Sequence, residues 1–472
     1  MVSFAEVSWP RQRCLTNTKA NRQRNVYTSR FGVRAIIPFL MLAAVLLALV
    51  SCTLFGQRPK PSPDTTPTAL PTPLTPAVNA TVPPQVTITA PPAITLTWWT
   101  VESFLPGAGS SGGTVLADQV ASFVDASASV ASVHAVQKAA HGKGGVLDLM
   151  RAAQTVAPSI LPDLVSLDAL EMESAVRLGL LKPLDKLIPA ELRNDLYPFA
   201  QMAGQVEETW YGIPYQADIQ HLVYWADRLD MPPVTWQDVL NSHRVYLFPA
   251  GGRKGIASDA TLIHYLSAGG EMATDGRGVV LSEGPLRAVL TFYASGRQAG
   301  VIPPTALDLR TTEATWPTFT ARRADMVHVQ ASQYLAERTQ MERVEHAAIP
   351  GADGRSVTIA KTWVLGIVTN DPARQAAAAN LITWLLQPEN SATWSQAAGY
   401  LPTRAAAMAV WDSEGAYASF LRTQLRVAVP YPSGPTYAAT AKALQVGVNL
   451  VLRGAASPEE AAKRALSLEG QP

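Results

Sequence analysis

A proline-rich stretch at residues 59–92 limits most strongly what this chain can fold into. It holds 11 prolines interspersed with many threonines. Because proline has no backbone N–H and a fixed φ, such a segment cannot enter the interior of a helix or a sheet. At about 3.1 Å per residue the segment could reach on the order of 100 Å. We interpret it as an extended stalk, and the alternative is a disordered tail.

The segment before the stalk has two contrasting parts. Its first 34 residues carry seven lysines and arginines and a single acid, a charge of +6, so the rest of the +1 chain carries −5. Ala35–Val50 then contains no polar side chain. Sixteen apolar residues are few for a spanning helix, which needs about twenty. A basic flank followed by a short apolar core is typical of a secretory signal.

The apolar core ends in Leu49-Val50-Ser51-Cys52, which resembles the cleavage box of bacterial lipoproteins. This resemblance implies cleavage before Cys52 and a lipid on its sulfur, which would anchor the protein to the outer side of a membrane. The alternative is an uncleaved anchor with an incidental cysteine. We therefore expect a lipoprotein signal peptide at 1–51 and a lipidated cysteine with its linker at 52–93.

Composition excludes several classes of protein. With two cysteines in 472 residues, the chain cannot be a disulfide scaffold or a cysteine-based zinc protein. Its near-neutral charge argues against a surface built for nucleic acid. The sequence also lacks the usual histidine spacings of metal sites. We expect no metal, no cofactor, no nucleic-acid partner and a monomeric state.

From Ile94 onward, short apolar runs alternate with longer helical patterns, which is typical of the α/β class. We expect strands at 94–100, 160–167, 222–225, 245–248 and 363–368. We expect helices at 113–124, 172–180, 260–268, 286–296, 372–386 and 458–468.

Several motifs in this part resemble one family, the extracellular solute-binding proteins of ABC importers, and in particular their carbohydrate-binding, maltose-binding-protein-like group. The resemblance is carried by residues 161–189, 210–215, 222–227, 235–240, 319–326, 363–370, 387–389 and 399–404. Two positions depart from the family pattern. Trp225 stands where asparagine is usual, and Arg322 replaces a glycine.

The resemblance implies a type II periplasmic-binding-protein-like fold with two hinge-linked α/β lobes and a ligand cleft between them. Lobe 1 would comprise about 94–214 and 364–412, and lobe 2 about 215–363 and 413–472. The chain would cross between the lobes near Pro214, near 363–369 and again around 408–420. The implied function is capture of a small solute, in particular a sugar or oligosaccharide, for delivery to an ABC transporter permease.

Candidate ligand-binding residues are polar or aromatic side chains near predicted strand ends and crossings. Carboxylates suit hydrogen bonding to sugar hydroxyls, and aromatic faces suit sugar C–H groups. Trp99 is expected to stack on the ligand, and Asp218 falls where the family commonly has a ligand-facing acid. The full set is Trp99, Glu102, Asp168, Glu171, Gln216, Asp218, Asp259, Gln330, Ser332, Tyr334, Tyr431 and Tyr437.

A glycine-rich loop at 107–112 fits two other motifs poorly. It matches a dinucleotide-binding fingerprint, but the preceding strand ends too early and Asp125 follows too closely to serve as the ribose acid. It also overlaps a nucleophile-elbow pattern around Ser111, with no placed histidine or aspartate partner. We expect no catalytic residue. The alternatives to a solute receptor are a surface-anchored hydrolase acting on glycans or esters, and a stalked sensor or adhesin without a transporter.

Overall fold

The computed structural model describes residues 93–273, 278–411, 415–433 and 435–468, all of which belong to one compact unit. The predicted signal peptide, Cys52 and the stalk lie outside the described residues. Within the described residues, no helix has the length and apolarity needed to cross a membrane.

Most strands join one large mixed sheet. Its main order is β2-β1-β3-β12-β6-β10-β7, with β13 paired to β12 and β11 paired to β6. These strands are β1 (Ile94–Thr100), β2 (Val130–Gln137), β3 (Leu164–Asp168), β6 (Ile213–Trp225), β7 (Tyr246–Leu247), β10 (Met326–Gln330), β11 (Val344–Ala347), β12 (Thr358–Ile367) and β13 (Ala428–Pro430). Two short hairpins pair β4 (Gln205–Val206) with β5 (Thr209–Trp210) and β8 (Glu271–Met272) with β9 (Val279–Val280).

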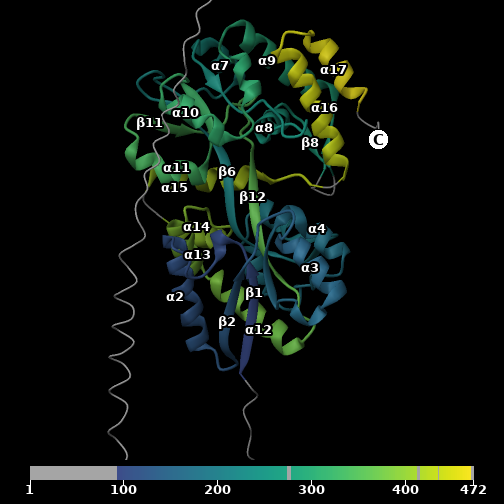
Figure 1. Ribbon diagram of the computed structural model, residues 1–472. Helices are drawn as coiled ribbons and strands as arrows, with labels where there is room; N and C mark the ends of the chain where they lie inside the picture. Colours follow the sequence, from purple (N-terminus) through teal and green to yellow (C-terminus); the bar gives the residue numbers. More distant parts are fainter. Residues whose placement is uncertain (1–92, 274–277, 412–414, 434, 469–472) are drawn as a thin grey trace, which may run out of the picture. The chain divides into compact units, whose positions relative to one another are not determined.

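Two long strands, β6 and β12, connect the two halves of this sheet. The first half of β6 pairs with β12, and its second half pairs with β10 and β11. β12 pairs in turn with β3 through residues Trp363–Ile367. Both strands pass between two groups of helices in Figure 1. The structure therefore has two lobes joined by crossing strands, which confirms the predicted fold class.

Each lobe covers its strands with helices (Figure 1). The lobe that contains β1 carries α2 (Ser111–Ala126), α3 (Val146–Val156), α4 (Ala169–Arg177), α5 (Ala190–Asn194), α6 (Pro198–Ala203), α12 (Pro372–Leu385), α13 (Pro388–Ala398) and α14 (Ala405–Val410). The lobe that contains β10 carries α7 (Trp236–Ser242), α8 (Asp259–Ser267), α9 (Glu283–Gln298), α10 (Trp316–Thr320), α11 (Ala331–Glu337), α16 (Pro435–Leu452) and α17 (Pro458–Leu466). We call the lobe that contains β1 the first lobe and the lobe that contains β10 the second lobe. α15 (Ala416–Val427) contacts α6 and α14 of the first lobe, and the hydroxyl of its Tyr417 forms a hydrogen bond with His221 of β6.

The structure extends one predicted strand and shortens another. The run expected at 222–225 is the end of the 13-residue β6. Its earlier part, from Pro214 to Gln220, alternates polar and apolar residues, which is itself a strand pattern, but the sequence does not show that it continues into the apolar run at 222–225. The strand expected at 160–167 begins only at Leu164, because a 3₁₀ turn with Pro158 at its first position precedes it.

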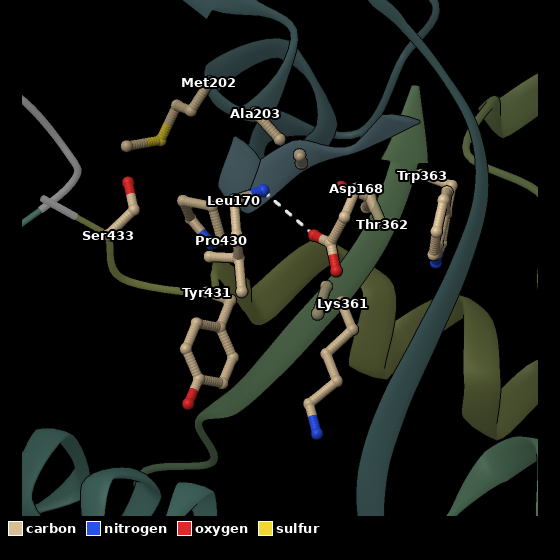
Figure 2. A pocket seen from close by; sticks show the side chains of 12 residues that line it. Asp168, Leu170, Met202, Ala203, Lys361, Thr362, Trp363, Pro430, Tyr431 and Ser433 are labelled. Atoms are coloured by element: carbon tan, nitrogen blue, oxygen red, sulfur yellow. Dashed lines mark hydrogen bonds between the residues drawn. The ribbon is translucent and has the colours of Figure 1, made fainter. Parts of the chain in front are cut away.

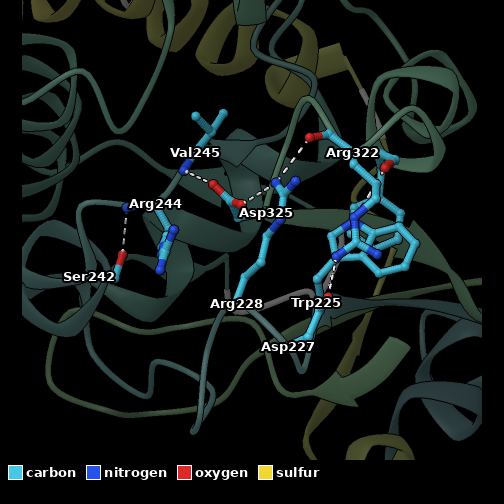
Figure 3. A network of polar contacts seen from close by, with 9 residues as sticks. Trp225, Asp227, Arg228, Ser242, Arg244, Val245, Arg322 and Asp325 are labelled. Atoms are coloured by element: carbon cyan, nitrogen blue, oxygen red, sulfur yellow. Dashed lines mark hydrogen bonds and ion pairs between the residues drawn. The ribbon is translucent and has the colours of Figure 1, made fainter. Parts of the chain in front are cut away.

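The two departures from the family pattern lie against each other (Figure 3). Arg322 has a φ of +56°, in the left-handed region that favours glycine. Its guanidinium carbon lies 4.1 Å from the centroid of the Trp225 ring, and its Nη2 lies 2.5 Å from Oδ2 of Asp227. The Trp225 indole also donates to the Phe319 carbonyl oxygen over 3.3 Å. The arginine and the tryptophan therefore form a contact that neither glycine nor asparagine could make.

Candidate functional site: a cleft between the lobes

The floor of the site is the ladder between β6 and β12. Lys361 lies opposite Asp218, and Trp363 lies opposite Gln216. Residues opposite each other in an antiparallel ladder project to the same face. A register shift at Trp363/Val364 leaves Tyr215 without a partner, as in a β-bulge. One face of the crossing strands therefore presents a lysine, a tryptophan and two polar side chains.

A cavity of about 420 Å³ opens over this floor, and a smaller one of about 120 Å³ adjoins it. Both share Asp168, Leu170, Lys361 and Tyr431 (Figure 2). Lining residues come from the first lobe (His141, Asp168), from the second lobe (Asp259, Glu313) and from the crossing strands (Lys361, Trp363). The two cavities therefore form one cleft between the lobes.

The wall on the first lobe is built at the end of β3. Asp168 caps α4, because its carboxylate accepts a 2.9 Å hydrogen bond from the backbone N–H of Leu170. His141 lies 3.5 Å from both the Asp168 and the Glu171 carboxylates, and its ring centroid is 5.7 Å from that of Trp363. Burial raises the pKa of both carboxyl groups. Desolvated carboxylates beside an aromatic ring suit hydroxyl groups on a solute.

The wall on the second lobe is built at the start of α8. Lys361 Nζ lies 2.5 Å from Oδ2 of Asp259, the first residue of that helix. Burial works against the charge of Lys361, but the carboxylates of Asp259 and Asp218 raise its pKa. The ammonium also lies 5.7 Å from the centre of the Tyr431 ring. Burial and the neighbouring Asp259 charge raise the pKa of Tyr431.

The rim of the larger cavity is strongly charged. Arg253, Arg310 and Glu313 line it, and all three are exposed residues of the second lobe. Charges of both signs therefore surround the opening. A fully apolar solute would find few partners there.

Three sequence-predicted residues line the cleft, and three others lie beside it. Asp168, Asp259 and Tyr431 are lining residues. Glu171 contacts His141, which itself lines the larger cavity. Gln216 and Asp218 stand on the β6 side of the floor.

Asp218 has a structural partner of its own. Its carboxylate accepts from the Ser332 backbone N–H over 3.1 Å and from the Ser332 hydroxyl over 2.6 Å, near the start of α11. Burial raises the pKa of Asp218 to about 6. This geometry favours a role in holding α11 against β6. Direct ligand contact by Asp218 and Ser332 stays a prediction.

The other predicted residues lie outside the cleft cavities. Trp99 is a core residue with Lys138 Nζ 4.5 Å from its ring centre, and Glu102 lines a separate cavity of about 480 Å³ in the first lobe. Tyr334 is buried and donates to the Val344 carbonyl oxygen over 3.3 Å. The remaining two, Gln330 and Tyr437, are also buried. Neither Trp99 nor Tyr334 lines the cleft cavities. That either ring stacks on a ligand stays a prediction.

Most lining residues were not predicted from the sequence, among them His141, Lys361 and Trp363. Lys361 had a detectable signal, because it is the only charged residue in the otherwise apolar and neutral run Thr358–Ile367. Trp363 alternates with it on the same strand. His141 lies in a loop and carries no pattern that would single it out.

A serine of the glycine-rich loop has a structural role. Ser110 caps α2 by accepting from the Gly113 backbone N–H over 3.1 Å. Within the ranges that the structure describes, no group of three or more His, Cys, Asp or Glu side chains is arranged to hold a metal ion.

Comparison with known proteins agrees with the two-lobed fold and the cleft. A family model described as bacterial extracellular solute-binding protein matches residues 143–418, more than half of the chain. The chain belongs to this family. It is a binding protein rather than an enzyme, and it acts outside the cytoplasm.

Solved structures of sugar-binding proteins share the fold. The cyclic alpha-maltosyl-1,6-maltose binding protein of Arthrobacter globiformis is 19% identical with a TM-score of 0.66, over 80% of this chain and 98% of that one. The sugar-binding protein MalE of Xanthomonas citri is 19% identical with a TM-score of 0.63, over 80% and 96%. Maltose-bound T. maritima MalE3 is 20% identical with a TM-score of 0.60, over 80% and 99%. At these identities the similarity establishes the fold.

Proposed function

We propose that this protein captures a sugar or oligosaccharide in the cleft between its lobes and delivers it to the permease of an ABC importer. The observation that carries the proposal is the composition of the cleft, where the Asp168 and Asp259 carboxylates lie around the aromatic rings of Trp363 and Tyr431. Carboxylates bind sugar hydroxyls, and aromatic rings pack against sugar C–H faces. Several structural neighbours are described as maltose or maltodextrin binders.

The proposal includes the attachment to the membrane. A lipid on Cys52 and the proline-rich stalk would tether the binding domain, 94–472, within reach of its permease. The lobe boundaries given above belong to the same proposal. A stalked sensor without a transporter would use the same cleft and the same anchor, so a cognate permease is what separates the two functions.

A thermal-shift screen against a panel of mono- and oligosaccharides tests solute capture. A solute that binds only the native state raises the melting temperature by mass action, so a saturating sugar should give a clear shift. A shift with amino acids, polyamines or peptides, and none with any sugar, would contradict the proposed solute class. Uptake of the identified sugar, lost on deletion of the chain, then tests delivery to a transporter.

A further inference from the structure

The core of the second lobe contains a row of buried hydrogen bonds between histidines and tyrosines. Nδ1 of His264 lies 2.7 Å from the Tyr293 hydroxyl, and Nε2 of His264 lies 2.8 Å from the Tyr246 hydroxyl. The same Tyr246 hydroxyl lies 2.5 Å from Nε2 of His328. All four side chains are fully buried. None of them lines the cleft.

The row continues to the wall of the cleft. Nδ1 of His328 lies 3.3 Å from Oε1 of Gln220, a residue of β6 that lines the larger cavity. The Gln220 amide nitrogen donates to Oδ2 of Asp259 over 3.3 Å. Lys361 binds the same carboxylate oxygen. A continuous set of hydrogen bonds therefore connects a buried core to a charged group of the binding site.

The Asp259 carboxylate determines which atom donates in the hydrogen bonds from Gln220 to Asp259 and from His328 to Gln220. A carboxylate only accepts hydrogen bonds, so the amide nitrogen of Gln220 must face it and the amide oxygen must face His328. An amide oxygen also only accepts. His328 therefore carries its proton on Nδ1.

The remaining proton positions follow in sequence. Burial lowers the pKa of His264 to about 3 and that of His328 well below its usual value, so both rings are neutral near pH 7. A neutral ring has one donor and one acceptor. Nε2 of His328 then accepts from the Tyr246 hydroxyl, whose oxygen accepts from Nε2–H of His264. Nδ1 of His264 finally accepts from the hydroxyl of Tyr293.

We propose that His328, Tyr246 and His264 are positioning residues, which fix the amide of Gln220 and through it the Asp259 carboxylate in the wall of the cleft. They act on the binding site without touching the solute. The expected effect on affinity rests on the proposed function of this cleft. The direction of the hydrogen bonds along the row can be tested without any ligand.

Long-range ¹H–¹⁵N spectra of the histidine rings measure which nitrogen carries each proton. In the wild type we expect His328 to be protonated on Nδ1 and His264 on Nε2. The opposite tautomer at either ring would overturn the proposal.

The Gln220→Leu variant tests whether the cleft sets this order. The Nδ1–H of His328 then has no acceptor, so in part of the population every hydrogen bond of the row should reverse its direction of donation. A second set of signals should therefore appear at His264, three hydrogen bonds away. Gln445→Leu is the matched control, because Gln445 is another buried glutamine of the second lobe whose amide donates to Ala250 and Asn449. If the His264 signals of Gln220→Leu are the same as those of the wild type and of the control, the proposal is contradicted.

The Gln220→Glu variant covers the case in which the leucine variant does not fold. The glutamate still accepts from His328, so the wild-type tautomers should remain, but its charge repels Asp259. Loss of the wild-type tautomers in this variant would count against the proposal.

Affinity is measured by calorimetry with a sugar of the panel that raises the melting temperature of the wild type. We expect both Gln220 variants to bind it about tenfold more weakly and Gln445→Leu to bind it as the wild type does. Unchanged affinity in the Gln220 variants refutes the positioning role. If no sugar binds the wild type, the proposed function fails, while the ring tautomers still decide the orientation of the row.

Discussion

Replacement of Arg322 separates backbone strain from side-chain contact at the one place where the chain departs twice from its family pattern. Arg322 has a φ of +56°, and its guanidinium packs on Trp225 (Figure 3). Arg322→Ala removes the contact and keeps the strain. Arg322→Gly removes the contact and also relieves the strain, because glycine adopts a positive φ at no steric cost.

The expected magnitudes follow from these two terms. A partly exposed cation–π contact contributes roughly 0.5–1 kcal/mol, and the surface ion pair with Asp227 adds little. A non-glycine residue in the left-handed region costs about 1 kcal/mol. We therefore expect Arg322→Ala to be destabilised by roughly 0.5–1 kcal/mol. Arg322→Gly should be about 1 kcal/mol more stable than the alanine variant and close to the wild type.

Urea denaturation followed by tryptophan fluorescence measures this order, with the midpoints of the three proteins compared at a common slope. In a Trp225→Phe background, Arg322→Ala should cost less free energy of unfolding, because the cation–π attraction to a phenylalanine ring is weaker than that to tryptophan. If the glycine variant is no more stable than the alanine variant, the backbone at position 322 is not strained and the reasoning is refuted. If the cost of Arg322→Ala is the same in both backgrounds, the guanidinium and the ring are not coupled.

Three further predictions concern Asp218, Trp363 and Cys52. Burial raises the pKa of Asp218 from 3.8 to about 6, so the contribution of this group to stability is fully present below pH 3.8 and is lost as the pH rises through about 6. The melting temperature of Asp218→Asn relative to the wild type should therefore rise between pH 3.8 and about 6, and a difference that does not change with pH would contradict the assignment. Trp363→Ala should weaken sugar binding about tenfold in calorimetry and Trp363→Tyr much less, because tyrosine keeps an aromatic face; equal losses would count against stacking. Cys52→Ala should abolish labelling by radioactive palmitate and release the protein from the membrane, whereas unchanged labelling would place the lipid elsewhere.

The α/β class could be predicted from local sequence patterns, and the two-lobed fold was implied by the resemblance of ordered motifs to one family. Apolar runs near Leu164 and Trp363 and the helix starts at Asp259 and Pro372 each carry a recognisable pattern. What the sequence could not show was continuity. β6 is one strand of 13 residues, but the sequence does not show that the alternating segment from Pro214 to Gln220 and the apolar run at 222–225 form a single strand.

The candidate site was predicted less completely, for a physical reason. Asp168 ends a strand and Asp259 begins a helix, so their place near the cleft could be expected. Burial and partners are not readable from one sequence, and they separate Asp218, which binds Ser332, from Lys361, which faces the cleft. The buried row that ends at Gln220 depends on contacts between residues far apart in sequence, such as Gln220 and His328, which are 108 positions apart.

Isothermal titration calorimetry of the full chain with the sugar panel, repeated on a variant of the cleft floor, measures whether this cleft captures a sugar. We expect at least one sugar to bind with a stoichiometry of one, and the double variant Lys361→Ala, Trp363→Ala to lose this binding while it keeps the wild-type circular dichroism. No binding by any sugar, or undiminished binding by the folded double variant, would contradict capture of a sugar in this cleft.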